Sequence, residues 1–314
     1  MEPKPEEYEF ELDHVLSAMV GIKAIAPPDA FTAETLGTER VGNGVLIDKA
    51  GTILTIGYLI TEAETVWLSL AGGRVVQGHV LGYDQETGFG LVQALARLDL
   101  PHMKIGNSAR AVTGESVVIA AAGGRAKALV GRILAKQEFA GYWEYVVDEA
   151  IFTAPAHPTW SGTALIGPAG ELLGIGSLQL QQQMRAGGAP IDVNMMVPID
   201  LLKPILEDMR TTGRRKDPPR PWLGFYATEM KDRLVVAGVS GRGPARKADV
   251  RPGDVIVRVA GREVRSLANL FRSIWSLGTA GVEVPLSLDR NGDMFEVRVK
   301  STDRARLMKG PILH

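Results

Sequence analysis

The sequence of 314 residues contains no cysteine, and its basic and acidic residues nearly cancel. The absence of cysteine excludes disulfide bonds, thiolate metal sites and a thiol nucleophile, and it fits a reducing or an oxidising compartment equally well. The 35 basic and 36 acidic residues leave a formal net charge of -1. Because so small a charge creates no overall field that attracts a polyanion, we do not expect nucleic acid as a partner.

Long hydrophobic runs are also missing. No uninterrupted apolar run approaches the ~20 residues that a membrane span needs, so we expect no membrane span. The first nine residues are acidic and lack the basic head and apolar run of an export signal. As written, the sequence predicts a cytoplasmic chain, or a periplasmic one if the native N-terminus has been trimmed. No group of His, Asp and Glu has the spacing of a metal site, and we expect neither metal nor cofactor.

The composition indicates a β-rich protein of more than one domain. Hydrophobic residues make up 45% and charged residues 23%, close to typical globular proteins, and the 36 Gly and 18 Pro suit a chain with many turns. The length exceeds that of one ordinary domain. The clearest boundary lies at residues 211–220, where a basic cluster and Pro218-Pro219 are typical of a solvated hinge. We predict an N-terminal arm at 1–14, a first domain at 15–210, a linker at 211–220, a second domain at 221–303 and a tail at 304–314.

A serine stands in a sharp turn near the middle of the chain. Ser161-Gly162 precedes an apolar pair, Leu165 and Ile166, and a second apolar strand follows at residues 171–176 after a Gly-Pro-Ala-Gly turn. This order is typical of a nucleophile loop, in which backbone N–H groups face a substrate carbonyl. A Ser-Gly pair alone is weak evidence because both are common turn residues, so the interpretation depends on the flanking strands.

The elements expected around this loop are mostly strands. Residues 41–59 contain two apolar strands around a turn at 48–51, which predicts a β-hairpin. Residues 198–209 have helical spacing, but Pro204 predicts two short turns or one bent helix. Residues 1–13 are polar and are expected to be loose. We further expect a strand or short helix at 15–26, strands at 67–81 (interrupted at 71–73), 130–135, 145–154, 193–197 and 234–239, and a helix at about 266–277.

The serine loop resembles the Asn-Pro-Gly-Asn-Ser-Gly-Gly-Pro-Leu segment of HtrA/Do-type trypsin-like proteases, which Pro158, Ser161, Gly162 and Leu165 match. Residues 41–59 resemble the family's hairpin that leads to the catalytic His, and residues 243–256 resemble its PDZ signature, Ser-Pro-Ala-x-x-Ala-Gly-Leu-x-x-Gly-Asp-Val-Ile. The resemblance covers roughly residues 15–300. It implies a mostly β fold: a chymotrypsin/trypsin-like double six-stranded β-barrel followed by an α+β PDZ domain.

Three catalytic positions of this family are occupied by other residues here. Tyr58 stands at the position of the general base His, Gly88 at that of the orienting Asp, and Thr159 at that of the oxyanion-hole Gly. A tyrosine has a reference pKa of about 10 and stays protonated near neutral pH, so it cannot accept the Ser161 proton efficiently. We predict a pseudoprotease that keeps Ser161 without its base. The alternatives are an active endopeptidase with an unconventional base, and an oligomeric scaffold whose serine loop binds peptides without cutting them.

No histidine stands where the family needs its base. Four of the five are expected to be structural or surface residues: His14, His79, His102 and His314. His157 lies four residues before Ser161 and aligns with the family's Asn, on the wrong side of the loop for the usual base. We expect a structural role for His157 as well.

The second domain carries the expected binding site. In PDZ domains a peptide C-terminus adds as a strand, and successive backbone N–H groups of a Gly-containing loop hold its carboxylate. That loop is expected to be Trp222-Leu223-Gly224-Phe225, and a facing helix carries residues at a spacing of three and four. These residues either line the groove or only fill the core: Leu267, Leu270, Phe271 and Ile274. The partners implied are C-terminal peptides with a free carboxylate or unfolded protein segments.

The family resemblance also implies a homo-oligomer, most simply a trimer. Members of the family assemble through their protease domains and N-terminal arm. Tyr8 and Phe10 are the aromatic residues of the arm here, and they are the local support for this expectation. The alternative is a mobile tail with incidental aromatic residues.

Overall fold

The structure is a computed structural model that describes residues 1–183 and 188–310. These residues form two compact units. The larger consists mainly of residues 1–137 and 149–216, and the smaller of residues 138–148 and 217–309. The change from the larger to the smaller unit after residue 216 lies within the residues expected to form the linker, 211–220. Residues 138–148, which we name the hairpin tip, belong to the smaller unit.

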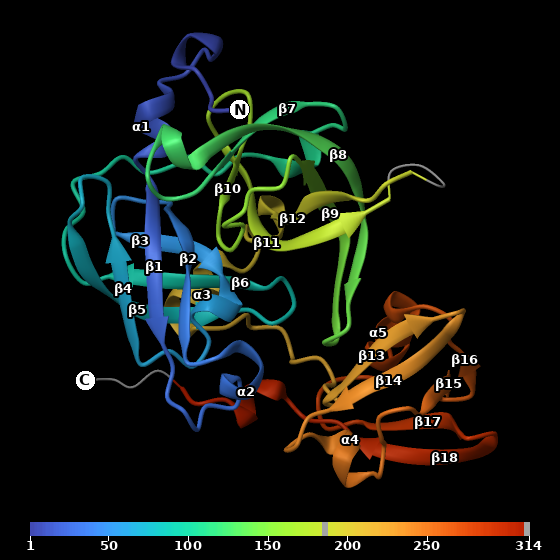
Figure 1. The fold of residues 1–314 in the computed structure, drawn as a ribbon. Coiled ribbons are helices and arrows are strands. Elements are labelled where there is room, and N and C mark those ends of the chain that lie inside the picture. Colours follow the sequence, from blue (N-terminus) through green and yellow to red (C-terminus); the bar gives the residue numbers. More distant parts are fainter. Residues whose placement is uncertain (184–187, 311–314) are drawn as a thin grey trace. The chain divides into compact units, whose positions relative to one another are not determined.

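The larger unit contains two closed barrels of six strands, as predicted (Figure 1). The order in the first barrel is β1 (Met19–Ile25), β2 (Glu39–Leu46), β3 (Thr52–Ile56), β6 (Phe89–Ala94), β5 (Val75–Tyr83) and β4 (Thr65–Ser69). The order in the second is β10 (Ala164–Ile166), β11 (Leu172–Gln182), β12 (Ile191–Pro198), β9 (Tyr145–Ala154), β8 (Ala128–Gly141) and β7 (Ser116–Ala120).

The hairpin of β2 and β3 follows from its sequence. The two strands pair antiparallel with Val45 opposite Leu54, and both side chains are completely buried. The turn between them closes because the Asp48 carboxylate accepts a hydrogen bond from Thr52 N at 3.1 Å. Gly51 adopts a φ of 88°, a left-handed conformation that glycine reaches without steric cost. The predicted hairpin is confirmed, and it leads directly to Tyr58.

Short helices connect and cover the barrels. A break near Pro204 separates η5 (Ile199–Leu201) from α3 (Leu206–Thr212), which agrees with the two short turns expected there. Arg215, in the predicted solvated linker, instead pairs with Asp84 at 2.9 Å and Glu86 at 2.6 Å. The remaining short helices of the larger unit are η1 (Pro5–Glu7), α1 (Leu12–Leu16), α2 (Ala33–Leu36), η2 (Gly57–Leu59), η3 (Ser108–Arg110) and η4 (Arg125–Lys127).

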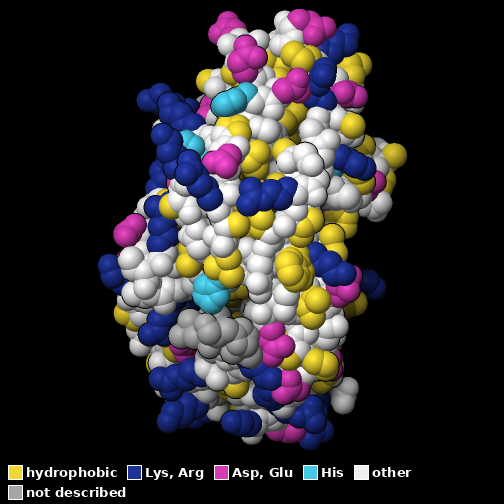
Figure 2. Space-filling view, turned by 90° about the vertical axis from the view of Figure 1, so that its left-hand side faces the viewer, with side chains coloured by type: hydrophobic (Ala, Val, Ile, Leu, Met, Phe, Trp, Pro, Cys, Tyr) yellow, Lys and Arg dark blue, Asp and Glu magenta, His cyan; other side chains and the backbone are white. Residues whose placement is uncertain are grey.

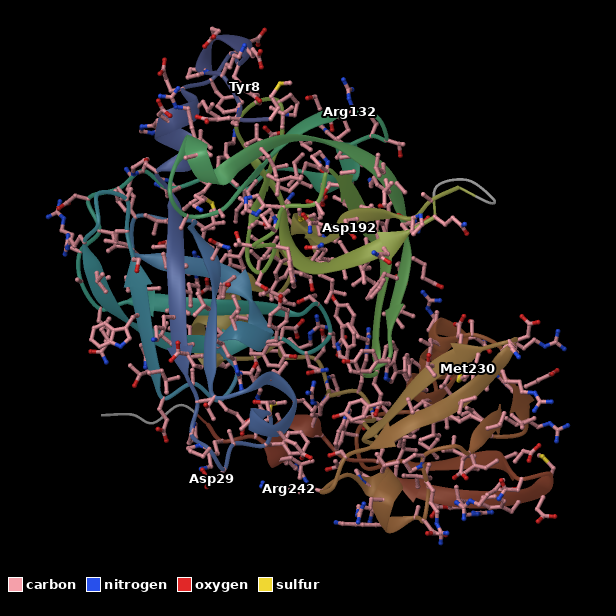
Figure 3. The ribbon with its side chains drawn as sticks, in the orientation of Figure 1. Tyr8, Asp29, Arg132, Asp192, Met230 and Arg242 are labelled. Carbon is pink, nitrogen blue, oxygen red and sulfur yellow. The ribbon has the colours of Figure 1, made fainter. Side chains whose placement is uncertain are left out.

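The N-terminal arm is not loose, contrary to expectation. The Met1 carbonyl accepts a hydrogen bond from Val130 N at 2.9 Å, which fastens the arm to β8. Phe10 lies against Gly170, where a Cβ would come within 2.8 Å of its ring. Tyr8, labelled in Figure 3, packs on Phe10 with ring centroids 5.2 Å apart. Both aromatic residues of the arm are therefore used within this chain.

The smaller unit is an α+β domain with one antiparallel sheet. Its strands follow the order β13 (Phe225–Met230), β14 (Arg233–Val239), β15 (Val255–Val259), β17 (Glu283–Arg290) and β18 (Asp293–Lys300), and β16 (Arg262–Glu263) pairs with β15. Its helices are α4 (Pro244–Lys247), α5 (Leu267–Trp275) and η6 (Arg304–Leu307). Helix α5 begins at a capping residue, because Ser266 Oγ accepts a hydrogen bond from Asn269 N. One apolar face of α5 packs on the sheet, which forms the core of this unit.

The surface is mixed in charge. Figure 2 shows Lys and Arg side chains interspersed with Asp and Glu and with apolar groups, in line with the net charge of -1. Among the described residues, no helix is both long and apolar enough to cross a membrane.

Candidate active site and peptide-binding site

Ser161 lies on a sharp turn that leads into β10. Gly162 adopts a φ of 76° and its N–H donates to the Gly176 carbonyl at 2.9 Å, while Thr163 N donates to the Trp160 carbonyl at 3.1 Å. A Cβ on Gly162 would come within 1.8 Å of the Asn43 carbonyl oxygen, so only glycine fits. The turn therefore presents Ser161 in the half-buried position that a nucleophile loop requires.

Tyr58 reaches Ser161 from the first barrel. Its Oη lies 2.7 Å from Ser161 Oγ and 2.7 Å from the carbonyl oxygen of Ser177. A phenol has one proton and a carbonyl oxygen can only accept, so Tyr58 donates to Ser177. The Ser161 hydroxyl then donates to Tyr58 Oη. The serine proton thus points at a neutral phenol.

The environment of Tyr58 makes proton transfer harder still. Burial raises the pKa of Tyr58 to about 12, against smaller opposing effects of hydrogen bonds with Ser161 and Trp160. The shift acts against the phenolate, which is the form that would remove a proton from Ser161. A general base works best when its pKa lies near the working pH. Tyr58 is therefore a hydrogen-bond partner of Ser161 whose raised pKa disfavours the form that could act as a base.

His157, the histidine nearest to Ser161 in the sequence, is fully engaged elsewhere. Its Nδ1 accepts a hydrogen bond from Thr159 N at 3.2 Å, which leaves Nε2 to carry the proton and donate to the Lys127 carbonyl at 3.0 Å. Burial lowers the pKa of His157 and keeps the ring neutral. With both nitrogens hydrogen-bonded to Thr159 and Lys127, His157 has no free nitrogen for the Ser161 hydroxyl.

Gly88 cannot orient a base, and its backbone serves the turn before β6. Its φ is 84°, its N–H donates to the Asp84 carbonyl at 2.8 Å, and its carbonyl accepts from Gly57 N at 2.7 Å. The Asp84 carboxylate accepts from the Thr87 N–H at 2.8 Å, so the aspartate of this turn holds its own loop. The position expected for an orienting carboxylate is a left-handed backbone turn.

Thr159 has no N–H available for an oxyanion hole. Its N–H donates a hydrogen bond to His157 Nδ1, and its carbonyl accepts one from Asn43 Nδ2 at 3.0 Å. The same Asn43 Nδ2 donates to the Ser161 carbonyl at 3.0 Å, and Asn43 Oδ1 accepts from Ala122 N at 3.0 Å. Asn43 thus binds the first barrel to the serine loop and was missed in the sequence. The signal available was its place between two glycines, Gly42 and Gly44, in a strand.

The other histidines lie apart from this arrangement. His14 is in α1, His79 is in β5 and His102 follows β6, while His314 lies outside the described residues. In the described part of the chain, no group of three or more His, Asp or Glu side chains is placed to hold a metal ion.

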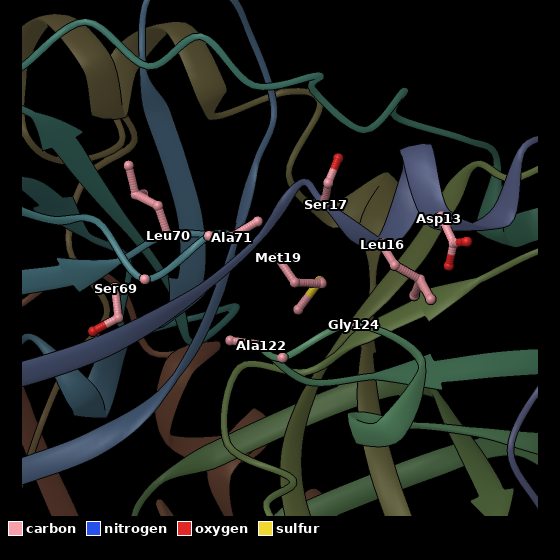
Figure 4. Close-up of a pocket in the computed structure, with 12 residues that line it drawn as sticks. Asp13, Leu16, Ser17, Met19, Ser69, Leu70, Ala71, Ala122 and Gly124 are labelled. Carbon is pink, nitrogen blue, oxygen red and sulfur yellow. The ribbon is translucent and has the colours of Figure 1, made fainter.

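A pocket of about 560 Å³ opens in the larger unit, but its lining does not include Ser161 or Tyr58 (Figure 4). It is bordered by α1, the start of β1 and the loop after β4. Its wall includes Asp13, Leu16, Met19, Leu70 and Ala122. This pocket carries no base or nucleophile cluster, and we assign it no chemistry.

The loop at residues 222–225 already holds a carboxylate. Gly224 adopts a φ of 78°, and its N–H donates to Glu144 Oε1 at 2.7 Å. The N–H of Leu223 donates to both oxygens of the same carboxylate, at 3.2 and 3.1 Å. Trp222 and Phe225 on either side are buried. Glu144 lies in the hairpin tip and was not singled out in the sequence.

The residues expected on the groove helix lie in α5. Leu270, Phe271 and Ile274 are completely buried in the apolar core of the smaller unit, while Leu267 is half-buried and packs against that core. Val146 of the hairpin tip belongs to the same cluster. Because the tip covers this cluster, burial alone does not separate groove residues from core residues.

Two protein families match the chain, one for each unit. The trypsin-like peptidase domain matches residues 42–175, and the PDZ domain matches residues 221–301. Two six-stranded barrels followed by this α+β unit define a trypsin-like fold joined to a PDZ domain. In both domains the chain resembles HtrA/Do-type proteases, the group that its curated relatives are named after.

The curated relatives are longer than this chain. A probable periplasmic serine endoprotease, DegP-like, of Hahella chejuensis is 28% identical over 280 residues, which cover 83% of this chain and 57% of the relative. The serine protease Do-like HtrA of Lactobacillus helveticus is 26% identical and matches 84% of this chain and 69% of its own length. The chain thus spans little more than half of the Hahella protein.

Solved structures share the fold. The HtrA-type protease AlgW with decapeptide has a TM-score of 0.56 at 20% identity, covering 96% of this chain and 98% of that chain. The serine endoprotease from Yersinia pestis has a TM-score of 0.54 at 24% identity, covering 92% and 95%.

Proposed function

We propose that the protein is a catalytically inactive member of its family, which keeps Ser161 and binds proteins or peptides through its PDZ domain. The observation that carries the proposal is the hydrogen bond from the Ser161 hydroxyl to the neutral phenol of Tyr58. The raised pKa of Tyr58 and the engaged nitrogens of His157 support it further. Acyl transfer needs a base within reach of the serine, and neither side chain can act as one.

Covalent labelling tests this proposal. A fluorophosphonate probe should label the natural protein no faster than Ser161→Ala, and unfolded casein should be cut no faster than background. Labelling or cleavage that disappears in Ser161→Ala would instead establish an active endopeptidase with an unconventional base.

The proposed ligand of the PDZ domain is a C-terminal peptide or an unfolded segment. Support comes from the backbone N–H groups of Leu223 and Gly224, which converge on a carboxylate. AlgW, a structural neighbour, was solved with a decapeptide. Peptides that end in an apolar residue should bind as free acids and not as amides, as isothermal titration can measure.

We further propose that the chain forms a homo-oligomer, most simply a trimer, in the periplasm. Support for the location comes from relatives whose names place them in the periplasm. The support for a trimer is the family resemblance. It is weakened because Phe10 packs on Gly170 of its own chain. Multi-angle light scattering at micromolar concentration should give three times the chain mass, and a monomer would remove the idea.

A further inference from the structure

The carboxylate in the 222–225 loop comes from the protein itself. Glu144 is 5% exposed, and the N–H groups of Leu223 and Gly224 contact its two oxygens at 2.7 to 3.2 Å. Successive backbone N–H groups around one carboxylate are the arrangement by which PDZ domains hold a peptide end. Burial raises the pKa of Glu144 to about 7, while hydrogen bonds from these N–H groups and the nearby Arg304 oppose the rise.

The backbone next to Glu144 contacts the strand that a peptide would join. Ala227 N in β13 donates to the Tyr142 carbonyl at 3.1 Å. The Tyr142 and Tyr226 rings meet edge to face, with centroids 5.9 Å apart. A peptide ligand of a PDZ domain is held in the same way, by main-chain hydrogen bonds to a sheet edge. The hairpin tip therefore makes a main-chain hydrogen bond to β13, of the kind that a ligand strand would make there.

The helix on the other side of the groove also contacts the hairpin tip. Arg272 of α5 pairs with Glu138 on one strand of the tip and with Asp148 on the other, at 2.5 Å in each case. Val146 of the tip is 8% exposed and packs in the cluster that contains Phe271 and Ile274. Polar and apolar contacts thus fix the tip against α5 as well as β13.

Resting on the peptide-binding function proposed above, we propose that the hairpin tip is an internal ligand of the PDZ domain, with the Glu144 side chain in the place of a peptide's terminal carboxylate. A C-terminal peptide must then displace the tip before it binds. Its apparent affinity is the intrinsic affinity reduced by the fraction of molecules in which the groove is open. A variant that weakens the contacts between the hairpin tip and the groove therefore binds peptides more tightly, although it makes no new contact with them.

The experiment compares the complete chain with Glu144→Ala and a matched control, Glu263→Ala. Glu263 is exposed, lies in the same unit and forms an ion pair with its neighbour Arg265 at 3.1 Å. The probe is a fluorescein-labelled pool of heptapeptides that end in Val, Leu or Phe, prepared as free acids and as amides.

Fluorescence polarisation should show that Glu144→Ala binds the acids at least about tenfold more tightly than the natural protein, since hydrogen bonds to a charged group are lost from the competing tip. Glu263→Ala should match the natural protein, and the amides should gain nothing.

Equal affinity of the acid pool for the natural protein and Glu144→Ala would overturn the proposal. If no protein binds the pool, the peptide-binding function fails, and a second measurement decides internal occupancy alone. In that measurement the Gly224 amide is followed by ¹H–¹⁵N NMR in the natural protein, Glu144→Gln and Glu144→Ala. An amide shift that moves in both variants supports occupancy by Glu144, and an unchanged shift overturns it. The Gln variant keeps the shape of the side chain, so misfolding of the Ala variant cannot hide the result.

Discussion

The serine loop and the loop at residues 222–225 each have their reactive groups paired with a residue of the same chain, but the two partners differ in kind. Ser161 is paired with Tyr58, a neutral phenol that cannot take its proton. The N–H groups of Leu223 and Gly224 are paired with Glu144, a carboxylate of the type that a peptide end supplies. Under the two proposals made above, the first site has lost its catalytic chemistry, whereas the second keeps its binding chemistry and is occupied by Glu144.

The contacts that hold the serine loop in place also differ from those that hold the hairpin tip in place. The serine loop is tied to the first barrel by the buried side chain of Asn43, which bonds the carbonyls of Thr159 and Ser161. The hairpin tip is held by the buried Glu144 and Val146, and also by an edge hydrogen bond and by ion pairs of the half-exposed Arg272. The ion pairs of Arg272 cost little to break, because exposed ion pairs contribute little. A peptide carboxylate would replace the hydrogen bonds that Glu144 accepts.

The largest expected effect comes from rebuilding the catalytic unit. Tyr58→His alone should leave fluorophosphonate labelling at the level of Ser161→Ala, because nothing orients the new base. Adding Gly88→Asp and Thr159→Gly should raise labelling by about a hundredfold or more, the range of one working acid–base catalyst. Asp tolerates the left-handed backbone at position 88 better than most residues do. Labelling of the single variant, or an inert triple variant, would contradict this account of the serine loop.

The second-largest expected effect is a pH dependence of stability that comes from Glu144 in the loop at residues 222–225. The pKa of Glu144 is about 7 in the folded protein, above its ordinary value of 4.5. The folded state therefore holds an extra proton on Glu144 between these values, so the contribution of Glu144 to stability is greatest below pH 4.5 and falls as pH rises to about 7. The loss is on the order of 3 kcal/mol.

Glu144→Gln cannot titrate and should lack this slope. Urea unfolding of the smaller unit, followed from pH 4 to 8 in the natural protein and the variant, measures the difference. Parallel curves would show that the carboxylate is not buried as described, and Glu144 would then be an exposed turn residue.

A smaller effect is expected from the residue that joins the barrels. Asn43→Ala should lower the free energy of unfolding of the larger unit by about 2 kcal/mol, because the buried Asn43 side chain is lost and partly buried backbone groups of Thr159, Ser161 and Ala122 lose their partner. The exposed Asn269→Ala on α5 serves as the control and should change stability by less than about 0.5 kcal/mol. Equal losses in thermal or chemical unfolding would mean that Asn43 does not fasten the serine loop.

Local patterns predicted much of the fold. Two apolar runs around the turn at residues 48–51 predicted the β2 and β3 hairpin, the spacing of apolar residues after Ser266 predicted α5, and Pro204 predicted the break before α3. These features depend on residues close together in the chain. The family resemblance placed Tyr58 opposite Ser161, and their oxygens lie 2.7 Å apart.

Contacts between distant residues could not be predicted in this way. Glu144 meets Gly224 across 80 positions, and Asn43 meets Ser161 across 118. The sequence did contain a weak signal for the first pair. Three aromatic residues lie at the hairpin turn, Phe139, Tyr142 and Trp143, whereas an exposed turn usually contains polar residues. Nothing local shows which surface such an aromatic turn will cover.

The hairpin tip also has a consequence for the order in which the chain is made. It is synthesised well before residues 217–309, the remainder of the unit to which it belongs. Domains emerging from a ribosome fold as units, N-terminal first. The two barrels can therefore fold while the hairpin tip is still uncovered, because the sheet of the smaller unit has not yet been synthesised. A nascent chain stalled at the linker would expose Val146 and its aromatic neighbours, a surface suited to capture by a chaperone until synthesis resumes.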